Sequence, residues 1–330
     1  MVRSRLVGPR LENTMTTRRT RASAVGVLAA VLLIATGQVH AQRRAVPDLQ
    51  GIWLSATSTP LQRPASMRDK LTFTPEEAAA YRKAAEERLR ARLPGDADRV
   101  VQNDLDEQFV ETENMPFDDM RTSLIVDPPN GLLPPQVPAA QARAAARPKR
   151  TFEGPETFGL GERCVVAIFG LGGSLAVPPL VPSEVIAPYY QIVQTADTVM
   201  LYAEWIHDVR VIRLNSTHVN PSVRKWLGDS IGHWEGNTLV VDTTNFRPDT
   251  HYLDSSQNMH VVERFTRVDA KTLRYRVTVE DPDTWTAPWT AEWSFRATDR
   301  PLFEVACHEA NYSMENFLRG ARDEERRQVR

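Results

Sequence analysis

The chain has 330 residues and a formal net charge of −2 at pH 7. Removal of residues 1–41, which are predicted to be an export signal, takes away six arginines and one glutamate and leaves 289 residues with a formal charge of −7. This charge argues against a nucleic acid as partner. The remaining length is enough for one large domain or two ordinary ones, with an ample core.

The N-terminus has the order of features that is typical of a secretory signal. Arg18, Arg19 and Arg21 precede an apolar run over 24–35, and the small-residue ending Val39-His40-Ala41 follows. The run is well short of the roughly 20 apolar residues that a membrane anchor needs. We therefore expect cleavage after residue 41, with 1–14 as a start-site extension, no stable membrane insertion afterwards, and a periplasmic or secreted mature protein.

Two cysteines remain after cleavage, Cys164 and Cys307. In an oxidising compartment such a pair is predicted to form a disulfide. A crosslink that closes so long a loop contributes about 4 to 5 kcal/mol in the chain-entropy model. The alternative is a reactive or metal-binding thiol, for which a second cysteine at C-x-x-C spacing is missing.

One helix is predicted early in the mature chain, over residues 71–94. Thr74 is a good N-cap, Pro75 suits the first helical position, and Glu77 completes a capping box. The apolar stripe of this helix is narrow, so we expect the helix to lie on a surface. Prolines punctuate the chain that follows, and residues 42–155 are interpreted as a strand, this helix and a proline-rich wrapping arm.

After Cys164 the sequence alternates with a period of two and is rich in Val, Tyr, Trp and Thr. Short turns such as Glu235-Gly236-Asn237 and Asp269-Ala270-Lys271 indicate an antiparallel meander. Residues 156–330 are therefore predicted to form a mainly β structure, an antiparallel barrel or a strongly curved sheet, in one domain with the arm. The predicted strands cover residues 189–195, 198–206, 209–214, 238–246, 261–268, 272–280, 290–297 and 302–307.

The hairpin around Asp269 allows a register to be predicted. With Val268 opposite Thr272, one face of the hairpin is apolar and the other carries arginines and threonines. Glu263 falls on the apolar face, where an unpaired carboxylate is costly. It is predicted to pair with an arginine or to line a cavity.

Two resemblances accompany this pattern. Gly51-Ile52-Trp53 resembles the G-x-W that begins lipocalin-type barrels, and the later meander is similar in layout, which implies a lipocalin-like barrel. Over nearly the whole mature chain the sequence also resembles an uncharacterised family of secreted bacterial proteins, which implies secretion and a β-rich fold but no activity. The segments that carry this second resemblance are 47–53, 123–129, 162–164, 206–210, 228–230, 234–236, 243–246, 307–309 and 311–312.

The densest polar cluster lies over residues 204–210. His207 is a candidate general acid or base near neutral pH, and Arg210 is a candidate for binding an anionic or carbonyl oxygen. Glu204 and Trp205 are candidate ligand contacts beside them. The alternative is a strand end that is held by an Asp–Arg pair and a hydrogen-bonded histidine.

A second candidate group follows Cys307. A disulfide at this cysteine would fix the backbone and hold His308 and Glu309 in place for catalysis, and Tyr312 would add a hydroxyl. The alternative is that His308 and Glu309 only cap the last strand. Trp285 and Trp289 are further candidates for ligand binding, because they lie in a predicted loop, where they suit an apolar or sugar-ring ligand at a barrel mouth.

No metal and no cofactor are predicted. His233 and Glu235 have a spacing that suits two metal ligands on one strand face, but the flanking glycines favour a hairpin turn. The sequence has no H-E-x-x-H, C-x-x-C or H-x-H motif. A G-x-S-x-G elbow and a P-loop are also missing, which argues against a serine hydrolase and a phosphate site.

These features lead to a hypothesis of a cofactor-free acid–base enzyme, lyase-like or isomerase-like, that acts on a small, partly apolar organic molecule in the barrel. His207 and His308 would transfer protons, Glu263 or Glu309 would assist, and Arg210 would stabilise negative charge. Two alternatives remain, a non-catalytic lipocalin-like binding protein and a structural partner in an envelope complex. An enzyme needs a histidine and a carboxylate within hydrogen-bond reach in an open cavity, whereas a binding protein needs only the walls of that cavity.

Overall fold

The structure, a computed structural model, describes residues 46–92, 119–147, 151–166, 168–169, 173–174, 177–180, 189–250, 252–309 and 311–329. The chain divides into two units, Met1–Ala45 and Val46–Arg330, and every described residue belongs to the second unit. The predicted signal over 1–41 therefore lies outside the described residues.

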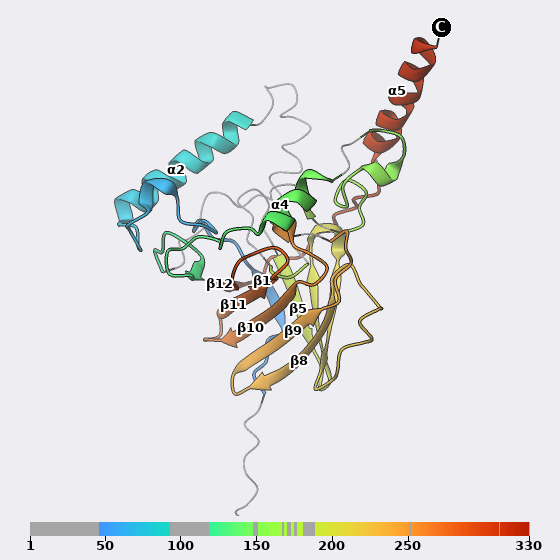
Figure 1. Ribbon diagram of the computed structural model, residues 1–330. Helices are drawn as coiled ribbons and strands as arrows, with labels where there is room; N and C mark the ends of the chain where they lie inside the picture. The colour runs from blue at the N-terminus through green and yellow to red at the C-terminus, as the bar shows by residue number, and fades with distance from the viewer. Residues whose placement is uncertain are drawn as a thin grey trace, which may run out of the picture. The chain divides into compact units, whose positions relative to one another are not determined.

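Nine strands of the described chain close into a β-barrel, which confirms the predicted mainly β fold (Figure 1). The last strand returns to the first, with Trp53 of β1 opposite Ala297 of β12. Closure pairs the edge groups that an open sheet leaves exposed. In order around the barrel, the strands are β1 (Gly51–Leu54), β5 (Tyr189–Gln194), β6 (Thr198–Ala203), β7 (Val209–Leu214), β8 (Asp229–Glu235), β9 (Thr238–Thr244), β10 (His260–Arg267), β11 (Thr272–Glu280) and β12 (Trp289–Thr298).

Three short strands lie outside this closed ring. β2 (Ile125–Asp127) pairs with the beginning of β12 and so ties the proline-rich arm to the barrel. β3 (Ile168–Phe169) and β4 (Gly173–Ser174) form a small antiparallel sheet of their own.

One neighbouring pair departs from the predicted antiparallel meander. β7 and β8 run parallel, with Ile212 opposite Ser230, whereas the other neighbours in the barrel are antiparallel. The cause is the connection over 215–228, since a parallel neighbour needs a crossover of about a dozen residues or more. His233, expected in a turn, lies within the regular strand β8, and the turn follows it at Gly236.

The hairpin between β10 and β11 has the predicted register. The Val268 amide donates to the Thr272 carbonyl at 3.0 Å, and Phe265 lies opposite Tyr275. The side chains of the predicted apolar face are buried, and Glu263 is buried among them. Alternation with a period of two therefore holds along both strands.

The strand prediction is wrong at the end of β6 and over residues 302–307. β6 ends at Ala203, before the predicted end at residue 206, because a tight turn begins there. Residues 302–307 form no strand in the described chain. β12 is already bonded to β11 on one side and to β1 and β2 on the other, so it offers no free edge to a further strand.

Three α-helices are described outside the barrel. α2 (Pro75–Arg92) starts with the expected reciprocal bonds: the Glu77 amide donates to Thr74 Oγ1 at 3.3 Å, and the Thr74 amide donates to Glu77 Oε2 at 2.8 Å. α4 (Pro138–Ala145) and α5 (Tyr312–Gln328) have no counterpart in the sequence prediction. No helix among the described residues has both the length and the apolar character to cross a membrane. Single 3-10 turns are η1 (Ala65–Met67), η2 (Pro155–Thr157), η3 (Trp205–His207) and η4 (Tyr252–Asp254).

The barrel interior is packed with aromatic side chains. Trp53, Tyr190, Tyr275 and Trp293 are each at most 1% exposed, and the Tyr275 ring meets the Trp293 ring edge-on with 4.6 Å between centroids. Such apolar surroundings raise the cost of any unpaired charge in the core.

Cys164 and Cys307 form the predicted disulfide, across 143 residues of sequence. The bond joins the chain that precedes β3 to the chain that links β12 with α5. Two segments that are distant in sequence are thereby fixed next to each other.

Candidate functional site

His207 lies in the tight turn that ends β6. Ile206 and His207 both have positive φ angles, 59° and 46°, a conformation that non-glycine residues seldom adopt. The His207 imidazole is exposed, and among the described residues it bonds to no carboxylate. The expected pairing of His207 with His308 or with a glutamate is therefore not seen.

The neighbours of His207 in sequence point to different places. Glu204 is buried and accepts hydrogen bonds from Arg300 and from the Phe303 amide, both at 2.7 Å. This carboxylate anchors the chain that follows β12. Trp205 is half-buried. The cluster over 204–210 thus does not converge on one site.

Arg210 and Glu263 form a bidentate ion pair inside the barrel. Arg210 Nη1 and Nη2 lie 2.6 and 2.9 Å from the two Glu263 carboxylate oxygens, which confirms the predicted arginine partner of Glu263. Tyr275 also donates to Glu263, at 2.8 Å, and accepts from the Leu180 amide at 3.1 Å. Burial raises the pKa of Tyr275, so this phenol stays a neutral donor.

His308, Glu309 and Tyr312 are exposed beside the disulfide. Glu309 lines a pocket of about 530 Å³, but His308 is not among its lining residues. Within the described ranges, His308 forms no side-chain hydrogen bond to a carboxylate. Of the two groups that were expected to act together after Cys307, only Glu309 therefore lines this pocket.

Trp285 and Trp289 are buried, at 2% and 0% exposed. Their rings meet edge-on, with 5.9 Å between centroids. Contrary to the expectation from the sequence, they fill the core and do not line an open barrel mouth, because Trp289 begins β12 with its side chain turned inward.

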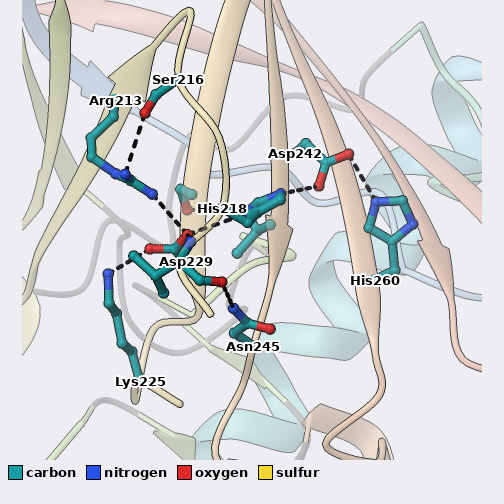
Figure 2. A network of polar contacts seen from close by, with 11 residues as sticks. Arg213, Ser216, His218, Lys225, Asp229, Asp242, Asn245 and His260 are labelled. Carbon is teal, nitrogen blue, oxygen red and sulfur yellow. Dashed lines mark hydrogen bonds and ion pairs between the residues drawn. The ribbon is translucent and has the colours of Figure 1, made fainter. Parts of the chain in front are cut away.

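A different set of ionisable side chains converges on the outer face of β8, β9 and β10 (Figure 2). Asp229, Asp242 and His260 occupy outward positions on these three strands, since Ser230, Val241 and Val261 beside them face the interior. The connection over 215–228 crosses this face and brings further polar side chains to it.

Asp229 is the buried centre of this network, with a side chain that is only 1% exposed. Its Oδ2 accepts hydrogen bonds from Arg213 at 2.8 Å, from the Val219 amide at 3.0 Å and from His218 Nδ1 at 3.1 Å. Its Oδ1 lies 2.5 Å from Lys225 Nζ. Hydrogen-bond donors from β7 and from the crossing connection thus meet at one carboxylate.

His218 links this carboxylate to a second one. Its Nε2 lies 2.9 Å from Asp242 Oδ1, and the other oxygen of Asp242 lies 3.0 Å from His260 Nε2. His260 Nδ1 lies 3.8 Å from Glu280 Oε2. Figure 2 shows His218 between the two aspartates, with His260 at the far side of Asp242. The side chains are 25% exposed at His218, 39% at Asp242 and 35% at His260, so the chain of bonds runs from a buried carboxylate to solvent.

Hydrogen bonds join the connection over 215–228 to the residue that follows β9. The Lys225 amide donates to the Asn245 carbonyl at 3.0 Å, and Asn245 Nδ2 donates to the Val219 carbonyl at 3.1 Å. Gly228 enters β8 with a φ of +71°, and a Cβ at this position would lie 2.7 Å from Thr243 Cγ2. Glycine therefore allows the connection to approach β9 closely enough to deliver His218.

The pKa values follow from these contacts. Burial opposes ionisation of Asp229, but hydrogen bonds from Lys225, the Val219 amide and His218 outweigh it and lower the pKa to about 2. In Asp242 the two imidazoles likewise overcome desolvation and lower the pKa. The hydrogen bond to Asp242 raises the pKa of His260, against partial desolvation. Both aspartates are thus ionised at neutral pH.

The geometry assigns distinct roles to the imidazole nitrogens. An ionised carboxylate only accepts hydrogen bonds, so both bonds of His218 form together only when both of its nitrogens carry protons. In His260, the proton on Nε2 is held by Asp242, which leaves Nδ1 as the position that gains and loses a proton. An imidazole that is oriented by a carboxylate is suited to acid–base chemistry.

The comparisons with known proteins give this chain no relative. No family model, no curated protein and no solved structure matches it. Among the described residues, no group of three or more His, Cys, Asp or Glu side chains is arranged to hold a metal ion.

His218, Asp242 and His260 were not predicted from the sequence. His218 comes from an irregular connection, and its two aspartate partners come from separate strands, so no spacing along the chain links them. One signal was present in the sequence. Asp242 interrupts the apolar run of β9 at an outward position, where a carboxylate is expected to have a hydrogen-bond or ion-pair partner.

Proposed function

We propose that this protein is an exported enzyme that performs cofactor-free acid–base chemistry on a small, partly apolar organic molecule at the outer face of β8, β9 and β10. The proposal keeps the reaction class expected from the sequence and transfers the proton-carrying role from His207 and His308 to His260. The observation that supports it is the unbroken series of hydrogen bonds from buried Asp229 through His218 and Asp242 to His260.

Each member of the network has a separate task in this proposal. His260 Nδ1 exchanges a proton with the substrate, since it is the imidazole nitrogen that Asp242 does not hold. Asp242 orients the ring and offsets the positive charge of its protonated form, as the carboxylate does in catalytic triads. His218, anchored by Asp229, fixes Asp242 from the other side. Such supporting contacts keep a reacting group within about 0.5 Å of its productive position.

A periplasmic or secreted location is part of the same proposal. It is supported by the arginine-rich start, apolar run and small-residue ending over residues 18–41. The Cys164–Cys307 disulfide supports it independently, because disulfides form and persist in oxidising compartments.

The test is proton exchange at carbon. The protein is incubated in D2O with small carbonyl compounds that carry a C–H bond beside the carbonyl group, and loss of the proton signal is followed by NMR. At least one compound is expected to exchange faster than in buffer. Replacement of the proton-transfer group in His260→Asn is expected to slow this exchange by about 10² to 10⁴-fold.

The matched control is His233→Asn. His233 is an exposed histidine on β8, and it pairs with Glu235 outside the network. This variant is expected to keep the wild-type exchange rate. Equal rates for the His260 and His233 variants, or a panel in which nothing exchanges faster than in buffer, would contradict the proposal.

A second candidate function is binding of a small molecule inside the barrel. Tyr190 Oη and Arg210 Nε are buried there and have no hydrogen-bond partner among the described residues. Buried polar atoms are usually paired, so a small polar ligand in the interior would satisfy both. Native mass spectrometry of protein from its own compartment tests this, since a retained ligand that disappears in Tyr190→Phe is the expected result and a ligand-free mass argues against it.

A further inference from the structure

A short stretch that belongs to no strand, residues 177–180, packs into the interior of the barrel. We call it the inner segment. Val177 and Leu180 are fully buried and belong to the main hydrophobic core, and Pro178 and Pro179 between them are buried as well. The Leu180 amide donates to the hydroxyl of the inward-facing Tyr275, at 3.1 Å. The chain thus places part of its own backbone among the interior side chains.

The interior ion pair shows how deep this contact lies. The Tyr275 hydroxyl that accepts from Leu180 also donates to Glu263 at 2.8 Å, and Glu263 is bonded to Arg210. Arg210 lies on β7 and Glu263 on β10, and β8 and β9 separate these two strands in the ring. The two side chains therefore meet inside the barrel, and the Leu180 amide lies next to them.

The inner segment is attached to the barrel in a different way from the strands. Backbone hydrogen bonds to neighbours on both sides hold a strand such as β11 in the ring. Pro178 and Pro179 have no amide hydrogen to donate, and the Leu180 amide bonds to a side chain and not to a strand. Native proteins open locally at free energies below that of global unfolding, and paired core strands are the last parts to open. The attachment of Leu180 favours an early opening of this stretch.

The ion pair is complete without the inner segment. The Glu263 carboxylate accepts from Arg210 and from Tyr275, and neither contact involves an atom of residues 177–180. If Leu180 moves away, Tyr275 loses one donor but keeps its own hydrogen bond to Glu263. Departure of Leu180 therefore leaves no buried charge unpaired, and an unpaired buried charge would be the most costly consequence.

We propose that the inner segment is a plug that leaves the barrel interior while the ring of strands stays folded. Its departure gives water or a small molecule access to the Tyr275 hydroxyl and to Arg210 Nε, which is buried and has no hydrogen-bond partner among the described residues. The plug does not depend on the acid–base chemistry proposed for the outer face, because no residue of that network takes part in it.

Amide hydrogen exchange of the full chain with its disulfide intact, followed by NMR at several low urea concentrations, tests the proposal. The reference is the amide of Val277, a fully buried residue of β11 that lies between β10 and β12. The Leu180 amide is expected to exchange about tenfold faster than this reference or more. The urea dependence of its exchange is expected to lie between zero and that of Val277, because opening of the plug exposes less surface than global unfolding.

Two results with the wild type would overturn the proposal. Exchange of Leu180 with the rate and urea dependence of Val277 would make the inner segment part of the cooperative ring. Exchange of Leu180 without any urea dependence would show a fluctuation of one amide and no departure of the segment.

The variant Tyr275→Phe removes the acceptor of the Leu180 amide. It is expected to speed exchange of this amide about five- to tenfold, as the loss of one hydrogen bond does, while the urea dependence stays below that of Val277. The matched control is Tyr252→Phe, since Tyr252 is also buried and its hydroxyl has no hydrogen-bond partner among the described residues. Leu180 is expected to exchange in this control as in the wild type. The same rate for Leu180 in both variants would contradict the assigned contact between plug and barrel.

Discussion

Asp229 and Glu263 are both almost fully buried carboxylates, and they are neutralised in different ways. Glu263 depends on Arg210, which is itself 2% exposed. Asp229 forms ion pairs with Arg213 and Lys225, whose side chains are 35% and 44% exposed. The counter-charges of Asp229 are therefore in contact with solvent, whereas that of Glu263 is not. Of the two carboxylates, only Asp229 thus has partners whose charges the solvent screens.

The raised pKa of His260 makes stability depend on pH in a defined direction. Its hydrogen bond to Asp242 favours the protonated ring in the folded state. This contribution is fully present below the unfolded pKa of about 6.5 and is lost as pH rises through the higher folded value. The stability advantage of the wild type over His260→Gln should therefore shrink as pH rises.

Urea unfolding of both proteins between about pH 5 and 9 measures this difference. Because the His260 side chain is 35% exposed, solvent screening limits the expected change to about 1 kcal/mol or less. A difference that grows with pH, or one that stays constant across the range, would show that Asp242 does not favour the imidazolium.

At the scale of elements, the connection over 215–228 both creates the parallel β7–β8 pair and carries His218 to the barrel wall. Its last residue, Gly228, combines a φ of +71° with a close approach to β9. Any side chain there would push the connection away from the wall. Strand order and network assembly thus depend on the same short piece of backbone.

Gly228→Ala is expected to lower the free energy of unfolding by about 2 to 4 kcal/mol, from the left-handed backbone and the overpacking together. Its new Cβ would lie 2.7 Å from Thr243 Cγ2, 2.8 Å from Phe246 Cε1 and 2.9 Å from a backbone carbonyl. Gly236→Ala is the control, since Gly236 has a similar φ of +62° and a Cβ at that position would have no described neighbour within 4 Å. It should cost only about 1 kcal/mol. Equal losses in urea unfolding would show that the close approach is unimportant.

Local alternation predicted the elements that depend on local contacts. The bounds of β7 and β11, the register of the Asp269 hairpin and the arginine partner of Glu263 follow from a period of two and the cost of a buried charge. The parallel β7–β8 pair and the network around Asp242 depend on how a long connection crosses the sheet, which neighbouring residues do not encode. The tight turn after Ala203 is a second feature that alternation does not reveal. The polar residues at 204–210 were therefore predicted to share one site, whereas their side chains point in different directions.

At the scale of the whole molecule, the Arg210–Glu263 pair joins β7 to β10 through the core of the barrel. Arg210→Met alone leaves a buried carboxylate without its counter-charge and is expected to cost about 3 to 5 kcal/mol. Adding Glu263→Leu removes that charge, so the double variant is expected to recover much of the loss. Urea unfolding of the two single variants and the double variant measures the coupling energy.

An exposed pair of the same residue types provides the reference. Arg264 and Glu235 lie 2.6 Å apart on the outer face, with side chains 39% and 48% exposed. The cycle of Arg264→Met and Glu235→Leu is expected to give a coupling of about 1 kcal/mol or less. Similar coupling energies in the two cycles would mean that burial adds nothing to the interior pair.

Closure of the barrel has a consequence for how the chain reaches this structure. β1 ends at Leu54, yet it bonds to β12, which begins at Trp289. β1 can pair with β5 earlier, but its second edge finds its partner only when the last strand of the ring has been synthesised. Contacts between such distant segments slow folding, so closure of the ring is expected to be a late and slow step for this chain.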